Sequence, residues 1–187
     1  MSVLPIASSI TTVGRLRSIP TGVVLRLGRL LGNMDAIRAS LQAALSIGVL
    51  GLVAWASGRP AVFPSLGPSA FVLATRPDAA ASRPRRVIGG HVIGVLAGLA
   101  AYHALAAPIA VTGSPLPLSI AWLRLAASAT IATALTAGGM LATDLRHAPA
   151  CATTLVVALG IQSTPVGGGV IVVAVVFLVG IFRVAFE

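Results

Sequence analysis

The chain has 187 residues, of which 57% are hydrophobic and only 9% charged, and its mean hydropathy is +1.00. These values exclude an ordinary soluble domain and indicate a protein surrounded by lipid. The 13 basic residues outnumber four acids and are all arginine. Because they lie between apolar segments rather than along one face, nucleic-acid binding is not expected. The single cysteine, Cys151, excludes an internal disulfide and a cysteine-based metal cluster.

Residues 1–35 are predicted to form a basic cytoplasmic arm ahead of a single transmembrane domain, residues 36–187. The arm lacks a long apolar run followed by a cleavage site, so a signal peptide is not predicted. Within it, residues 22–31 place Arg26 and Arg29 three positions apart among apolar side chains, a pattern suited to an anionic membrane surface. Two alternatives stay open: a disordered tail, and a natural start at Met34.

Four apolar segments are long enough to span a bilayer, which takes about 20 residues: residues 38–57, 87–107, 119–142 and 170–184. Two shorter apolar segments lie between them. Residues 61–75 begin with prolines and glycine, which predicts an irregular loop and then a half-helix from near Pro68. An arginine-bearing loop, residues 76–86, comes after it. Residues 150–161 form the second short run, and the glycines at 167–169 are expected to separate it from the last span.

The order of long span, proline-led short segment and long span occurs twice. It predicts an all-α polytopic membrane protein with two three-segment repeats, residues 36–110 and 119–187. If the short segments cross the membrane, most arginines lie on one side, which is then the cytoplasmic side. The two repeats are in that case inverted relative to each other. In transporters with inverted repeats, discontinuous helices build a substrate site near the membrane midplane. If the short segments are re-entrant, the repeats are parallel and the loop of residues 76–86 lies outside. We favour the inverted arrangement.

The beginnings of the two short helices are candidate anion sites, because a helix N-terminus is the positive end of its dipole. Ser69, Thr153 and Thr154 add hydroxyl donors. The alternative is that the prolines and glycines only break helices and allow close packing. The predicted site residues at these helix ends are Gly67, Pro68, Ser69 and Ala70 in the first repeat, and His147, Ala148, Pro149, Ala150, Cys151, Thr153 and Thr154 in the second. Gly89, Gly90 and His91 of the first repeat complete the predicted substrate-binding site.

His91 comes directly after Gly89 and Gly90 within an apolar segment, and ionisable groups at membrane depth usually face a cavity or a partner. We expect it to be a donor to substrate or a proton relay, with a purely structural histidine as the alternative. His103 is expected at the membrane interface.

Three arginines are candidate pathway residues. Arg85 and Arg86 either steer an anion at the cytoplasmic mouth or only fix orientation, and Arg124 either snorkels outward or belongs to the pathway.

An enzymatic function is not expected. None of the four acids has a second carboxylate at helical spacing, and the HExxH, GxSxG and P-loop patterns are absent from the sequence. The three histidines have no metal-ligand spacing, so neither a metal nor a cofactor is predicted.

The run Pro84-Arg85, then Val87-Ile-Gly-Gly-His91, together with the earlier stretch Phe63-Pro-Ser-Leu-Gly-Pro-Ser-Ala-Phe-Val-Leu-Ala74, closely resembles the HPP family of integral membrane proteins. The resemblance covers residues 36–187. The sequence departs from the family pattern in two places: Arg86 replaces an asparagine, and His147-Ala-Pro-Ala-Cys-Ala152 replaces the His-Pro-Pro-Ala-Gly-Ala motif that names the family, with Ala148 for a proline and Cys151 for a glycine. The resemblance implies a transporter-like protein, with nitrite or nitrate as the leading substrate.

Taken together, the sequence predicts a channel or transporter for a small inorganic anion in a prokaryotic plasma membrane, with its N-terminus in the cytoplasm. Because a complete pathway in one chain of 18.7 kDa is tight, we expect a homo-oligomer with a pathway inside each protomer. The alternative is a membrane scaffold or assembly subunit, in which side chains seal the segment that starts at Pro68.

Overall fold

The computed structural model describes residues 21–58 and 61–186, with side chains from residue 34 onward. Contacts divide the chain into two units, residues 1–35 and 36–187. Of the first unit, only the first part of helix α1 is described, and the remaining helices all belong to the second unit. The assignment of the two units to a basic arm and a transmembrane domain stays a prediction.

Four long helices and two short ones make up most of the described chain. The long helices are α1 (Thr21–Ser57), α3 (Pro84–Ala101), α4 (Ile120–Ala142) and α6 (Pro165–Ala185); the short ones are α2 (Leu66–Thr75) and α5 (Ala150–Ala158). A π-helical turn, η2 (Tyr102–Ala106), extends α3, and two 3-10 turns, η1 (Ala80–Ser82) and η3 (Val111–Gly113), lie in loops.

The predicted fold class is confirmed. Four segments are apolar and long enough to cross a membrane: Met34–Ser57 in α1, Pro84–Ala106 formed by α3 together with η2, Ile120–Ala142 in α4 and Pro165–Ala185 in α6. Each short helix lies in sequence between two long ones, and the described residues contain no strand. The inverted relation of the two halves stays a prediction.

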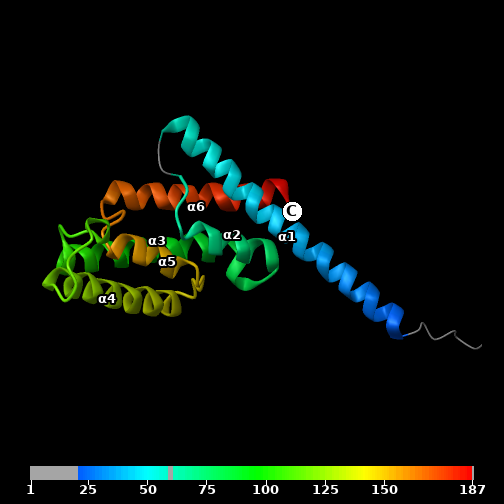
Figure 1. Ribbon diagram of the computed structural model, residues 1–187, viewed down its shortest axis with the longest axis horizontal. Helices are drawn as coiled ribbons and strands as arrows, with labels where there is room; N and C mark the ends of the chain where they lie inside the picture. Colours follow the sequence, from blue (N-terminus) through cyan, green and yellow to red (C-terminus); the bar gives the residue numbers. More distant parts are fainter. Residues whose placement is uncertain (1–20, 59–60, 187) are drawn as a thin grey trace, which may run out of the picture. The chain divides into compact units, whose positions relative to one another are not determined.

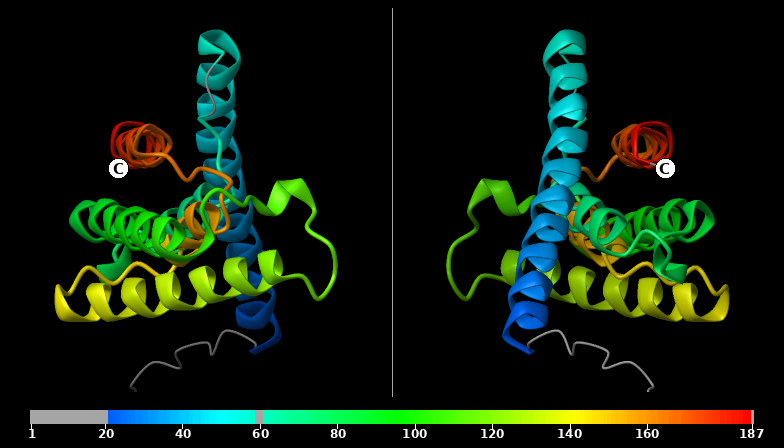
Figure 2. Two further views of the ribbon diagram at one scale, coloured as in Figure 1. Left: turned by 90° about the vertical axis from the view of Figure 1, so that its left-hand side faces the viewer. Right: turned by 90° about the vertical axis from the view of Figure 1, so that its right-hand side faces the viewer.

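Helix α3 is the central helix of the second unit. It packs against α4, α5 and α6, while α2 packs against α6. Figures 1 and 2 show α3 and α5 between α6 on one side and α4 on the other. Helix α2 of the first half and helix α6 of the second half therefore lie in contact. The main apolar core, which includes Leu66, Val87 and Ile171, lies among these helices.

Three boundaries differ from the sequence prediction. Residues 22–31, expected as a separate amphipathic stretch, are the first part of α1, which runs unbroken because no proline lies between Thr21 and Ser57. Helix α3 begins at Pro84, so Arg85 and Arg86 occupy its first turn rather than a loop.

The third boundary concerns the glycines at 167–169, which do not separate α6 from the preceding segment but belong to the helix. The Thr164 hydroxyl accepts a hydrogen bond from the Gly167 N–H at 3.0 Å, and Pro165 occupies the first turn, where no N–H partner is needed. The absent side chain at Gly168 allows close packing instead, because a Cβ there would lie 2.5 Å from Cγ1 of Val95.

A strip of glycines on α3 brings α5 close. Gly90, Gly94 and Gly98 are spaced by four residues and so share one face of the helix. A Cβ at Gly94 would lie 2.9 Å from the carbonyl oxygen of Ala150, and one at Gly98 would lie 2.7 Å from Cβ of Val157. Small residues of this kind let membrane helices approach at the backbone. The strip therefore sets the distance between the polar residues of α3 and those of α5.

We predict that Gly94→Ala lowers the melting temperature of the detergent-purified protein, because the added methyl group must push α5 away from α3 and overpacking costs about 1–3 kcal/mol. Gly180→Ala is the matched control, since nothing lies within 4 Å of the position that its Cβ would take. There the better helix propensity of alanine should stabilise the protein by roughly 0.5–1 kcal/mol. Equal shifts for both variants would contradict this account of α3–α5 packing.

Candidate functional site

Four polar side chains from four separate segments meet inside the apolar bundle. Ser69 and Thr153 each stand at the fourth position of a short helix, α2 and α5 respectively. His91 lies on α3, and His147 lies in the linker between α4 and α5. All four side chains are completely buried. We call these four residues the His–Ser–His cluster.

The hydroxyl of Ser69 bridges the two imidazoles. Its Oγ lies 2.9 Å from Nε2 of His91 and 3.1 Å from Nε2 of His147. The two rings are tilted by 49°, with centroids 5.3 Å apart. At the outer ends, Nδ1 of His91 lies 2.6 Å from Oγ1 of Thr153. The far nitrogen of His147, Nδ1, lies 2.9 Å from the carbonyl oxygen of Ala81. The result is one unbroken chain of hydrogen bonds.

The carbonyl at one end determines the direction of every bond in the chain when both rings are neutral. A carbonyl only accepts, so Nδ1–H of His147 donates to Ala81 and its Nε2 must accept. The hydroxyl of Ser69 therefore donates to His147 and accepts from Nε2–H of His91. By the same logic, Nδ1 of His91 accepts from the hydroxyl of Thr153. The two histidines thus carry their hydrogens on different nitrogens.

The surroundings of His147 favour its neutral form. His147 lies in a linker outside the four spanning segments. Burial lowers the pKa of its imidazole below the ordinary value, and the hydrogen bond to the Ala81 carbonyl acts in the opposite direction. A neutral ring agrees with the accepting role of its Nε2.

The linker that carries His147 is fixed to the first turns of α3. Arg86 forms an ion pair with Asp144, which also lies 3.6 Å from Arg146. The missing side chains at Gly89 and Gly90 make room for this linker: a Cβ at Gly90 would lie 3.1 Å from Cβ of His147. The run of glycines before His91 therefore lets the second imidazole approach the first.

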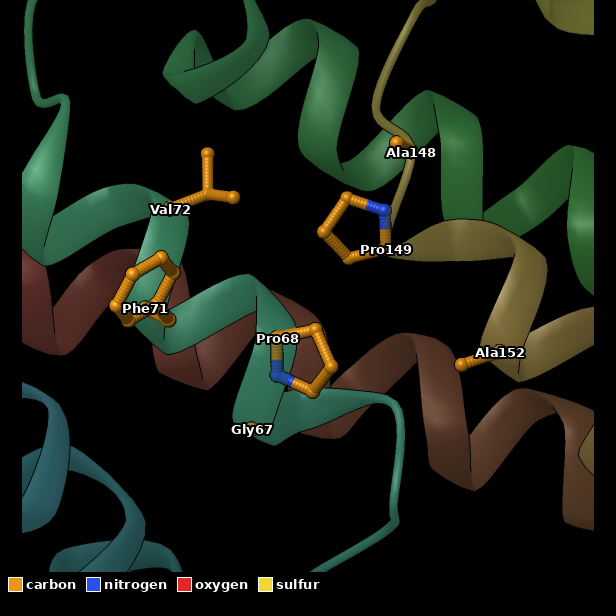
Figure 3. A pocket seen from close by; sticks show the side chains of 7 residues that line it. All are labelled: Gly67, Pro68, Phe71, Val72, Ala148, Pro149 and Ala152. Atoms are coloured by element: carbon orange, nitrogen blue, oxygen red, sulfur yellow. The ribbon is translucent and has the colours of Figure 1, made fainter.

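An open hollow of about 630 Å³ lies beside the cluster, between α2 and the start of α5. Figure 3 shows the rings of Pro68 and Pro149 on its two sides. Its lining is apolar, and several lining residues are direct sequence neighbours of a member of the His–Ser–His cluster. The lining residues are Gly67, Pro68, Phe71, Val72, Ala148, Pro149 and Ala152.

The backbone of α5 is less available to an anion than the sequence suggests. The N–H groups of Ala150, Cys151 and Ala152 already donate to carbonyls of residues 147–149, at 3.0–3.1 Å. Donors at this end must therefore come from side chains. The thiol of Cys151 is half-buried and not in a disulfide.

Thr154 belongs to a second polar contact and not to the cluster. Its Oγ1 lies 2.8 Å from Oγ1 of Thr136, and both side chains are fully buried. Ala70, another predicted site residue, is buried in the apolar core rather than exposed to a cavity.

The remaining predicted pathway residues lie away from the cluster. Arg85 is exposed. Arg124, exposed on α4, donates to the carbonyl oxygens of Leu105 at 2.6 Å and Ala107 at 3.1 Å, so it caps the end of the π-helical turn. His103 is exposed and contacts the carbonyl of Ser163 at 3.1 Å.

Two contributors to the candidate site were not predicted from the sequence. The first is the Ala81 carbonyl, which has no sequence signal, and the second is Ser65. Ser65 is completely buried, and its Oγ has no hydrogen-bond partner among the described residues; its position one turn before Ser69 is the signal that could have identified it. Within the same residues, no three His, Cys, Asp or Glu side chains are grouped as a metal site requires.

A family of known proteins matches the chain. The family model described as "HPP, transmembrane region" matches residues 31–186, which contain α2 to α6 and every member of the His–Ser–His cluster. Neither a curated protein nor a solved structure matches the chain. The family match covers most of the sequence. The four candidate spanning segments of the chain are those expected of a multi-pass membrane protein. The chain therefore belongs to the HPP family of integral membrane proteins.

Proposed function

We propose that the protein is a channel or transporter for a small inorganic anion, with nitrite or nitrate as the leading substrate. The anion binds near the first turns of α2 and α5, at the His–Ser–His cluster. Membership of a family of membrane proteins and four apolar spanning helices are consistent with a transporter-like role.

The observation that carries this proposal is the burial of four hydrogen-bonding side chains inside an apolar bundle. Burial of polar groups costs free energy even when they are paired, and such groups within a membrane protein usually mark a pathway. The imidazole N–H groups and the hydroxyls of Ser69 and Thr153 are donors of the kind that an anion requires. In the present conformation they donate to one another and to the Ala81 carbonyl, so a bound anion takes the place of one of these acceptors. Ser65 supports this, because its buried hydroxyl has no partner among the described residues and is available to bind an anion.

The position of the cluster adds electrostatic support. Ser69 and Thr153 lie at the positive ends of two helix dipoles, which favour negative charge in a medium of low dielectric constant. Because backbone amides of α5 are already paired, the direct contacts come from side chains. Exposed Arg85, in the first turn of α3, is placed to attract anions to that end of the helix.

In the present conformation the four cluster side chains are completely buried, so an anion reaches them when α2 and the start of α5 move apart. The hollow at Pro68 and Pro149 lies between these two elements. It supports transport over the alternative scaffold function, in which side chains would seal the segment that begins at Pro68. A homo-oligomeric state, a prokaryotic plasma membrane and a cytoplasmic N-terminus belong to this proposal.

Anion uptake into proteoliposomes tests the proposal. Nitrite, nitrate, formate and chloride are compared for wild type, Ser69→Ala, His91→Ala and His103→Ala. We expect selective uptake by wild type and a loss of about 100-fold in the first two variants, since removing one buried donor to an anion typically costs on the order of 3 kcal/mol.

His103→Ala is the matched control, because His103 is an exposed histidine whose hydrogen bond in the described structure goes to a loop carbonyl. It should transport like wild type. Size-exclusion chromatography confirms that each variant is folded. Folded wild-type protein that carries none of the four anions in either orientation would contradict transport and favour the scaffold.

A further inference from the structure

The Ser69 hydroxyl has two acceptors at the same distance. Nε2 of His147 and the carbonyl oxygen of Ser65 each lie 3.1 Å from its Oγ. Rotation about the Cβ–Oγ bond exchanges these acceptors without moving a heavy atom. When His147 is neutral the hydroxyl donates to its Nε2, and when His147 carries a second proton the hydroxyl can turn to Ser65. The bridge therefore has a hydrogen-bonded arrangement for either charge state of His147.

We propose that Thr153, His91, Ser69 and His147 form a proton relay, and that the protein carries the anion of a weak acid together with one proton. This inference rests on the transport function proposed above and narrows its substrate class. Nitrite is the anion of a weak acid, whereas nitrate and chloride are anions of strong acids. A buried chain of hydroxyls and imidazoles, each within hydrogen-bond distance of the next, is the arrangement that proton transfer requires.

Transfer begins when a weak acid, HA, gives its proton to Oγ1 of Thr153 while the original hydroxyl proton passes to Nδ1 of His91. The Nε2 proton of His91 passes to Oγ of Ser69, and the Ser69 proton passes to Nε2 of His147. HA has then become A⁻ and His147 has gained one proton, while Thr153, His91 and Ser69 are neutral again. No group is oxidised or reduced.

The Nδ1 proton of His147, which points at the Ala81 carbonyl in turn η1, is then taken up by water that enters from the neighbouring exposed loop. The two rings are left with their hydrogens on the opposite nitrogens. Before the next turnover, α2 and the start of α5 move apart and water reaches the rings. Each imidazole then takes a proton from water on the nitrogen that lacks one and returns the other proton to water, which restores the starting arrangement with no net gain or loss of protons. The relay therefore connects the anion site with the exterior of the bundle.

The charged groups around the relay lie at its His147 end. Asp144 precedes His147 in the linker and pairs with Arg86 and Arg146. On α5, the thiol of Cys151 is half-buried two residues before Thr153, and the two imidazoles face each other. Among the described residues, neither ring forms an ion pair with a carboxylate, so an added proton is not held in place by a fixed negative charge.

Two buried threonines provide a matched pair of variants. Thr153→Val removes the hydroxyl at the start of the relay, while Thr136→Val removes an equally buried hydroxyl that bonds Thr154 instead. Both substitutions nearly conserve volume. Thr153→Ser restores the hydroxyl and should restore transport.

The experiment measures anion uptake and internal pH together, in proteoliposomes loaded with a pH-sensitive dye. Protein-free vesicles correct for passive entry of nitrous acid. We expect nitrite uptake with equal proton uptake, at a rate that depends on the pH gradient and not on an imposed potassium diffusion potential. Thr153→Val and Ser69→Ala should lose about 100-fold, the low end of the contribution of a positioned proton donor, whereas Thr136→Val should match wild type.

Nitrite uptake without proton uptake, at a rate set by the diffusion potential, would overturn the relay and leave anion transport intact. Equal transport by Thr153→Val and Thr136→Val would also overturn it. If folded wild-type protein carries no anion, the proposed function itself fails and the relay fails with it.

Discussion

The requirement that every buried polar group find a partner shapes the centre of this protein. In an apolar bundle, an imidazole without hydrogen bonds is costly, and two imidazoles at 5.3 Å need partners that satisfy both. One hydroxyl, that of Ser69, does this by accepting from His91 and donating to His147. Because these groups come from three segments distant in sequence, α2, α3 and the α4–α5 linker must be held in register. Much of the surrounding structure can be understood as the means of holding them.

The means are mostly small residues and short helices. The glycine strip on α3 lets α5 approach at the backbone, which places Thr153 within 2.6 Å of His91. The ion pair of Arg86 with Asp144 fixes the linker that carries His147. Short helices α2 and α5 each present the side chain at their fourth position to the interior of the bundle.

The fold class could be predicted from the sequence because hydropathy, helix length and proline placement are local signals, and the same signals singled out the four residues that meet in the candidate site. These signals predict four spans and two short helices, and they identify Ser69, His91, His147 and Thr153 as candidates. The Ser69 bridge between the two imidazoles could not be predicted, since it depends on how α2, α3 and the α4–α5 linker pack together in three dimensions. The glycines at 167–169 predict a break because glycine weakens an isolated helix. In the bundle, close packing against Val95 and the Thr164 cap outweigh that weakness.

The hydrogen positions in the His–Ser–His cluster are central to both proposals, and nitrogen NMR of protein labelled at its three histidines measures them directly. We expect His91 to carry its hydrogen on Nε2 and His147 on Nδ1, and we expect Ser69→Ala to change both signals while exposed His103 is unaffected. Two cluster histidines with their hydrogens on the same nitrogen, or signals that do not respond to Ser69→Ala, would contradict the bridge.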